Sequence, residues 1–177
     1  MAYGVIRTDR MYGTDVAPNL VSVKYMGTGT TATAIENGNV VKLNGLMTGE
    51  REVYKGVTPA ANTPLDQIAI IASPEVMYDE RKHNLDQFIN EADRISRAYI
   101  PHVHGIFSVT KEDLDTTAIQ DSDDDEEVLP VVGNIVELMA GTKLKVTASL
   151  TSGSTKVGEI IQVETTKRYT YYVIEVK

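Results

Sequence analysis

The chain has 177 residues, of which 42% are hydrophobic and 24% are charged, and its formal net charge at pH 7 is −8. These values are typical of one soluble globular domain or two closely packed lobes, and no apolar run approaches the roughly 18 to 20 residues of a membrane span. The absence of cysteine excludes disulfides and thiolate metal sites. The acidic charge disfavours nucleic acid as a partner, because no basic stripe offsets it.

Residues 1–20 show neither the period of a strand nor that of a helix, which predicts an N-terminal arm. The arm is too apolar for a disordered tail, so we expect it to order against a neighbouring molecule. The alternative is that it completes the protein's own sheet. The residues predicted to make the contact are Tyr3, Val5, Ile6, Arg7, Met11 and Tyr12.

Residues 21–177 are predicted to form one β-rich domain, which begins with an alternating strand at 20–26. The glycines at 27 and 29, followed by Ala32, have the spacing of a phosphate-binding loop, which requires a helix directly after it. Four β-branched threonines stand where that helix should begin, and Asn37-Gly38 then favours a hairpin turn. This segment therefore predicts strand, turn and strand, with no nucleotide site.

Further strands are predicted at 50–56 and at 66–73, the second being a continuous apolar run that should be covered on both faces. One helix is expected near residues 84–96, with Asn84 as its N-cap and Gln87 three residues later. Its apolar stripe consists of Leu85, Phe88, Ile89, Ala92 and Ile95.

Two strands are expected after the helix, at 98–103 and 105–110, followed by an acidic run at 121–127 that should form a mobile loop. Four more strand-like segments follow, with turn signals between them that predict an antiparallel meander. The predicted fold class is therefore mainly β, a barrel or sandwich with one short helical insertion, and α+β is the alternative. The four segments are 132–138, 142–150, 157–164 and 168–176.

Two groups of residues have metal-ligand spacing. Asp121, Asp123 and Asp125 match the first positions of a calcium loop, but Glu126 replaces the glycine needed for its turn and Val132 replaces the bidentate glutamate, so we expect no calcium site. His102 and His104 would share one face of a strand and, with His83, could bind zinc; the expected role is structural.

No catalytic motif is present, so we predict neither an enzyme nor a cofactor. The strand-like segment at the C-terminus carries Tyr169, Tyr171 and Tyr172. Since adjacent strand residues point to opposite faces, at least one hydroxyl should reach the surface, where tyrosine favours contacts. The alternative is that these tyrosines only fill the core.

The order of four segments resembles that of the small head proteins of tailed phages, the head decoration and virion structural proteins. The likeness covers most of the chain from Thr33 to the C-terminus and contains no catalytic signature. Asp93 and Ala98 stand where that family often has glycine. The segments are IENGNVVKLNGLMTGEREVYK, IAIIASPEVMYDERKHNLDQFINEADRISRAYIPHVHGIFSVT, LMAGTKLKVTASLTSGSTKVGEIIQVE and RYTYYVIEV.

This resemblance implies a capsid decoration protein, made in the host cytoplasm, that binds the outer surface of the major capsid protein lattice and stabilises the head. Its partners would be the major capsid protein and, in a dimer or trimer, further copies of itself, with neither nucleic acid nor membrane involved. The N-terminal arm would supply the capsid contact. The alternatives are a tail or baseplate protein and, from another class, a carbohydrate-binding module that uses Tyr169 or Tyr171 as its sugar platform.

Overall fold

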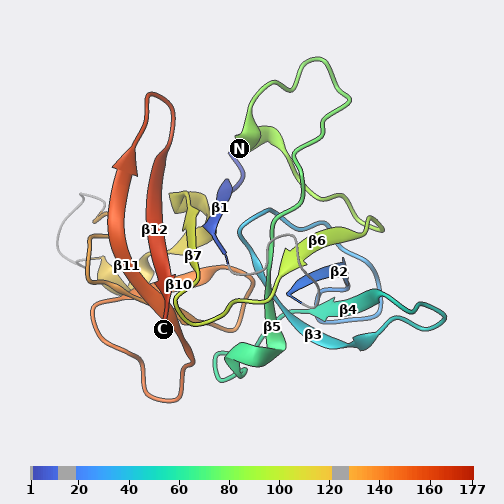
Figure 1. Ribbon diagram of the computed structural model, residues 1–177, viewed down its shortest axis with the longest axis horizontal. Coiled ribbons are helices and arrows are strands. Elements are labelled where there is room, and N and C mark those ends of the chain that lie inside the picture. The colour runs from blue at the N-terminus through green and yellow to red at the C-terminus, as the bar shows by residue number, and fades with distance from the viewer. Residues whose placement is uncertain (1, 12–18, 121–127) are drawn as a thin grey trace.

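The computed structural model describes residues 2–11, 19–120 and 128–177, and in these ranges the chain is built almost entirely from strands. The strands form two bodies, a closed barrel and a seven-stranded sheet, which lie side by side (Figure 1). The predicted class, mainly β with a barrel, is confirmed. The helical segments of the described ranges are 3-10 turns at Leu65–Gln67, Leu85–Gln87, Lys111–Asp113 and Thr117–Ile119.

The barrel has five strands in the order β2-β4-β3-β5-β6, closed on itself by the β2–β6 pair. The β2–β4 pair is parallel and the other pairs are antiparallel. Along β2, buried residues alternate with partly exposed ones, so that Val21 and Val23 point into the barrel and Ser22 points outward. The strands are β2 (Leu20–Tyr25), β3 (Val40–Leu46), β4 (Val53–Val57), β5 (Ile68–Ile71) and β6 (Ser96–Tyr99).

The second body is a sheet in the order β1-β7-β12-β11-β9-β10-β8, antiparallel except for the β10–β8 pair. The predicted meander is wrong in one respect, because β9 pairs with both β10 and β11 and therefore separates them. The strands are β1 (Ile6–Arg10), β7 (Ile106–Val109), β8 (Leu114–Asp115), β9 (Ile135–Leu138), β10 (Leu144–Thr147), β11 (Lys156–Thr165) and β12 (Thr170–Val176).

Strand β5 forms the wall between the two hydrophobic cores. Ile68 and Ile70 belong to the core that the barrel shares with the seven-stranded sheet, whereas Ala69 and Ile71 belong to the barrel interior. All four residues are fully buried. The prediction that this apolar run is covered on both faces is therefore confirmed, and the two bodies are joined through it.

The N-terminal segment is part of this fold. Strand β1 pairs with β7 at the edge of the sheet, and Val5, Ile6 and Met11 are 2%, 8% and 6% exposed. Because the sheet buries these side chains, the expectation of a separate arm is wrong over the residues described, and the alternative in which the segment completes the protein's own sheet is correct. Tyr12, like the acidic run at 121–127, lies outside the described residues.

The helix predicted near residues 84–96 is absent. Its N-terminal signal does form, because the Oε1 atom of Gln87 accepts hydrogen bonds from the backbone N–H groups of His83 (2.9 Å) and Asn84 (3.2 Å). The helical turn nevertheless ends after the three residues Leu85–Gln87. The sequence signal thus predicts the start of the helical turn correctly, but the helix does not extend beyond Gln87.

Tertiary contacts explain why the helix stops. Phe88 is already extended, and Asn90 forms an isolated β-bridge with Ile35, which gives its backbone groups partners outside any helix. Two residues of the expected apolar stripe, Leu85 and Ile95, are 40% and 56% exposed. An amphipathic helix depends mainly on burying its apolar face, and here that face has no core to pack on.

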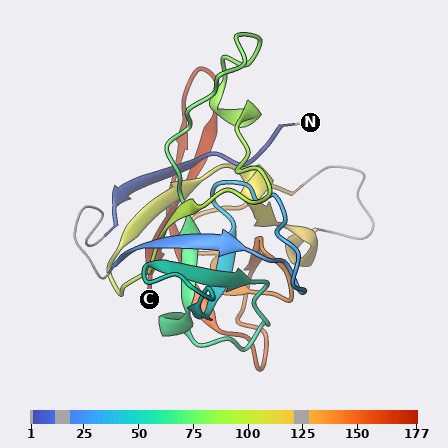
Figure 2. The same ribbon diagram turned by 90° about the vertical axis from the view of Figure 1, so that its right-hand side faces the viewer.

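Two long segments project from the same side of the molecule (Figures 1 and 2). One is the β5–β6 loop, residues 72–95, and the other is the β11–β12 hairpin, whose turn is at 166–169. Within the described ranges, no helix is long and apolar enough to cross a membrane.

Candidate functional site: a groove beneath the β5–β6 loop

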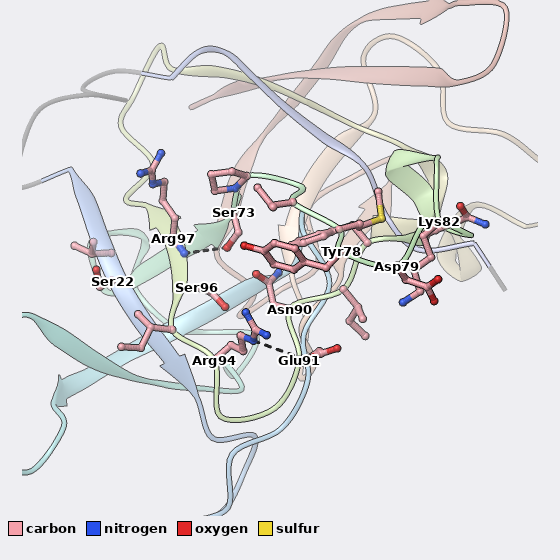
Figure 3. A pocket seen from close by; sticks show the side chains of 18 of the residues that line it. Ser22, Ser73, Tyr78, Asp79, Lys82, Asn90, Glu91, Arg94, Ser96 and Arg97 are labelled. Atoms are coloured by element: carbon pink, nitrogen blue, oxygen red, sulfur yellow. Dashed lines mark hydrogen bonds and ion pairs between the residues drawn. The ribbon is translucent and has the colours of Figure 1, made fainter.

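A groove with a volume of about 750 Å³ lies between the β5–β6 loop and the outer face of the barrel (Figure 3). Its floor includes Ser22 of β2 and Arg97 of β6, which are register partners on adjacent strands. Its walls come from the two arms of the loop, on either side of the loop tip. The groove therefore joins barrel residues and loop residues that are far apart in the sequence.

Two buried asparagines anchor the arms of the loop. The side chain of Asn37 exchanges hydrogen bonds with the backbone of Ser73, donating to its carbonyl (2.9 Å) and accepting from its N–H (3.0 Å). The side-chain amide of Asn90 donates to the Oδ1 atom of Asn37 (3.0 Å) and to the carbonyl of Ile35 (3.1 Å). Because both asparagines are at most 6% exposed, these bonds fix the groove walls to the segment before β3.

Further contacts hold the loop above the barrel. The carbonyl of Asp86 accepts a hydrogen bond from the backbone N–H of Tyr3 (2.8 Å), and its carboxylate accepts one from the hydroxyl of Tyr169 (3.3 Å). The Lys24 ammonium pairs with the Asp93 carboxylate at 2.9 Å. The N-terminal segment and the β11–β12 hairpin therefore both touch the loop.

The loop keeps large apolar side chains in solvent. Tyr78 is 85% exposed, and in Figure 3 its ring extends over the groove toward the side on which Ser73 lies. Val76 and Ile95, which also line the groove, are 58% and 56% exposed, and Leu85 is 40% exposed. This concentration of exposed apolar surface on one projecting element is typical of a contact surface.

Internal ion pairs account for part of the charge along the groove. Asp79 accepts a hydrogen bond from Arg81 at 2.9 Å, which holds the pKa of its carboxyl below the ordinary value. Glu91 lies 3.7 Å from Arg94. No comparable partner among the described residues pairs with the Arg97 guanidinium.

A second, smaller cavity of about 380 Å³ adjoins the groove along edge strand β1. Ser73, Pro74 and Arg97 line both spaces, so the two form neighbouring parts of one recessed surface. Arg7 lines the second cavity, where its guanidinium pairs with Asp9 (2.8 Å) and with Glu164 on the hairpin (3.0 Å).

The structure does not bring the three histidines together. His102 and His104 lie in the turn before β7 and not on a strand, and they contact Asn19 and Glu175 respectively. His83 lies in the β5–β6 loop. No group of three metal-ligating side chains occurs in the part of the chain that the structure describes. The loop at 27–32 continues into no helix, as expected; Asp121, Asp123 and Asp125 lie outside the described residues.

The C-terminal tyrosines are mostly buried. Tyr171 and Tyr172 are 5% and 2% exposed, so neither offers a platform for a sugar. Tyr169 is half-buried, its ring centre lies 6.0 Å from that of Tyr171, and its hydroxyl reaches Asp86. The core-filling interpretation is correct for Tyr171 and Tyr172, while Tyr169 alone retains exposed surface.

The five predicted contact residues that the structure describes divide into two groups, and the sixth, Tyr12, lies outside the described ranges. Val5, Ile6 and Met11 are buried in the protein's own core and are not available to a partner in this fold. Tyr3 is partly exposed and Arg7 is exposed. Their hydrogen bonds to Asp86 and Glu164 place them beside the β5–β6 loop and the hairpin. A contact role for Tyr3 and Arg7 stays a prediction.

Asp113 is a buried acidic residue that no sequence pattern indicates. Asp113, in a 3-10 turn of the sequence Lys-Glu-Asp, is fully buried, and neither of its carboxyl oxygens has a hydrogen-bond partner among the described residues. The carboxyl group packs against the backbones of Gly4 and Gly38, where any Cβ atom would overlap it. Burial first, and then the charge of Glu36, raises the pKa of Asp113 well above its ordinary value. The carboxyl group therefore lies where the N-terminal segment and the segment before β3 pack on the turn after β7.

Comparisons with known proteins return no relative: no family model, no curated protein and no solved structure matches this chain.

Proposed function

We propose that this chain is a structural protein of a tailed-phage head, which binds the outer surface of the major capsid protein lattice and stabilises the head without catalysing a reaction. The observation that carries the proposal is the exposed apolar surface of the β5–β6 loop, above all Tyr78 at 85% exposure. Such a surface on a projecting, anchored loop suits contact with another protein. The resemblance of the segment order to that of tailed-phage head proteins suggests that this other protein is the major capsid protein.

The side from which the loop and the hairpin project would face the capsid. Aromatic residues and arginine are favoured in protein interfaces, and Tyr3, Arg7, Tyr78 and Tyr169 all retain exposed surface on these neighbouring elements. An interface of about 1,000 Å² is enough for a specific contact. A copy that bridges two capsid subunits resists their separation, because they part only when one of its contacts breaks.

The charge of the chain is compatible with this placement. A protein on the outside of a DNA-filled shell needs no basic surface, so the net charge of −8 carries no penalty there. A tail or baseplate protein would make contacts through the same surface, and the co-sedimentation experiment below distinguishes it from a head protein. The carbohydrate-binding alternative has less support, because Tyr171 is buried and only Tyr169 is partly exposed.

The experiment is co-sedimentation with undecorated capsid shells of the phage that encodes the chain. We expect the wild-type chain to sediment with the shells and the Val76→Ser/Tyr78→Ser double variant to remain in the supernatant. Leu150→Ser is the matched control, because Leu150 is 46% exposed in the β10–β11 connection and lies outside the groove. A wild-type chain that stays in solution, or that sediments only with isolated tails, would contradict head binding.

A further inference from the structure

We propose that the groove beneath the β5–β6 loop binds an extended acidic peptide segment of the partner protein, with Arg97 holding a carboxylate of that segment and Tyr78 packing on its apolar side chains. The inference rests on the proposed function only for the identity of the partner, the major capsid protein. The chemistry of the segment follows from the groove itself.

The groove floor presents unused hydrogen-bond donors. The exposed Arg97 guanidinium makes no ion pair with any other residue that the structure describes. The Oγ atom of Ser73 accepts a hydrogen bond from the Arg97 backbone N–H at 3.0 Å, so its own proton remains available for donation. Ser22 adds a hydroxyl on the adjacent strand. A planar guanidinium can bind a carboxylate through two parallel hydrogen bonds, and a nearby hydroxyl can donate a further one.

Charge complementarity favours an acidic segment at this surface. The chain as a whole carries a net charge of −8, which repels acidic partners on average. Along the groove, however, Arg81 and Arg94 offset the anions Asp79 and Glu91. Arg97 and Lys82 then remain as cations without an ion pair to another described residue. An acidic segment therefore meets two cations along this groove, Arg97 and Lys82, which the groove's own anions do not pair with.

The topology indicates recognition through side chains. The barrel is closed, so β2 and β6 are both paired on two sides and offer no free edge to which a peptide strand can add. Successive side chains of an extended peptide point in opposite directions. An acidic side chain can thus reach Arg97 while its neighbours pack on the exposed side chains of Val76, Tyr78 and Ile95.

The test is an NMR titration of the ¹⁵N-labelled full chain with the peptide acetyl-VELEV-amide and with its uncharged counterpart acetyl-VQLQV-amide. We expect saturable shifts of the groove amides with the acidic peptide and about fivefold weaker binding of the glutamine peptide. Arg97→Gln should cause the same loss, and Tyr78→Ala should also weaken binding. Arg51→Gln is the control, since Arg51 is an exposed arginine outside the groove. Absent or non-saturable shifts, equal affinity for both peptides, or unchanged binding by the Arg97 variant would overturn the inference.

A second assay separates this inference from the proposed function. Shells that bind the wild-type chain and the Arg97→Gln variant equally would refute the peptide groove and leave head binding intact. Peptide binding without shell binding would refute head binding and support the groove. Sedimentation velocity addresses self-association: a dimer that Arg97→Gln dissociates would identify a second copy as the occupant and overturn the proposal.

Discussion

The packing of Asp113 against Gly38 predicts a large and specific cost for one added methyl group. A Cβ atom on Gly38 would lie within 2.5 Å of all three carboxyl atoms of Asp113, at a backbone φ of +86°. Gly153 is a matched control, because its φ is +84° and no atom lies within 4 Å of the same Cβ position. Left-handed strain of about 1–2 kcal/mol is common to both alanine variants, whereas overpacking adds about 1–3 kcal/mol at Gly38 alone.

The assay is urea unfolding of the wild-type chain, Gly38→Ala and Gly153→Ala, with Gly38→Ala repeated in an Asp113→Ala background. We expect Gly38→Ala to lose about 1–3 kcal/mol more free energy of unfolding than Gly153→Ala. Removal of the carboxyl group should recover most of this excess, which a double-mutant cycle reports as coupling. Losses that agree within about 0.5 kcal/mol, or additive effects in the cycle, would refute the packing of Asp113 on Gly38.

Four further predictions follow from the same structure. In Gly4→Ala the new Cβ would also overlap the Asp113 carboxyl group, so we expect a loss of about 1–3 kcal/mol; Gly29→Ala, with no atom within 4 Å, should be nearly neutral, and similar losses in the two variants would contradict the packing. Because burial raises the pKa of Asp113 above 3.8, the stability linked to its proton is present below about pH 4 and is lost as the pH rises through the folded-state pKa. Asp113→Asn should therefore gain free energy of unfolding relative to wild type between pH 4 and pH 8, by at most about 1.4 kcal/mol per pH unit in denaturant titrations, and a constant difference would argue against a buried neutral carboxyl. Burial acts to raise the pKa of Glu137, but hydrogen bonds from Thr151 and Lys145 outweigh it and lower this pKa below 4.5. The Glu137 carboxylate therefore contributes to the free energy of unfolding above that pH, and the contribution is lost on acidification. Glu137→Gln should cost about 1–3 kcal/mol at pH 7 and less at pH 3, and an equal cost at both pH values would contradict this reading. Finally, Ile6→Ala should cost about 2–5 kcal/mol in thermal or urea unfolding, because β1 is part of the core; unchanged stability would restore the independent arm.

The strands that could be predicted were those whose signal is local. The run at 68–71 is apolar at every position, and only burial on both faces removes all of these side chains from water. The alternation along Leu20–Tyr25 likewise fixed which side chains enter the barrel. In both cases the residues that decide the structure are adjacent in the sequence.

The failures arose where distant residues decide the outcome. The stripe at 85–95 has helical spacing, but the bridge between Ile35 and Asn90 and the lack of an apolar surface to pack on override it. Asn37-Gly38 does make a turn, with Gly38 at positive φ, yet the preceding residues form only that bridge and no hairpin strand. Local propensity predicts the turn correctly, but the hairpin strand that it predicts before the turn does not form.

The groove and the buried carboxyl left no sequence signal that could be read in advance. The groove floor pairs Ser22 with Arg97, whose proximity depends on closure of the barrel. Asp113 stands in an ordinary polar segment, and its burial follows from packing against Gly4 and Gly38, which belong to two other parts of the chain. The apolar content of the N-terminal segment is evident from the sequence, but β7, the strand with which it pairs, lies about a hundred residues later.

The most direct measurement of the central claim is a cryo-electron microscopy reconstruction of undecorated capsid shells incubated with an excess of the purified chain. The account predicts ordered added density on the outer surface of the shell, with the β5–β6 loop and the β11–β12 hairpin directed toward the major capsid protein. Bare shells at saturating concentration, or bound copies whose β5–β6 loop points away from the shell, would contradict it.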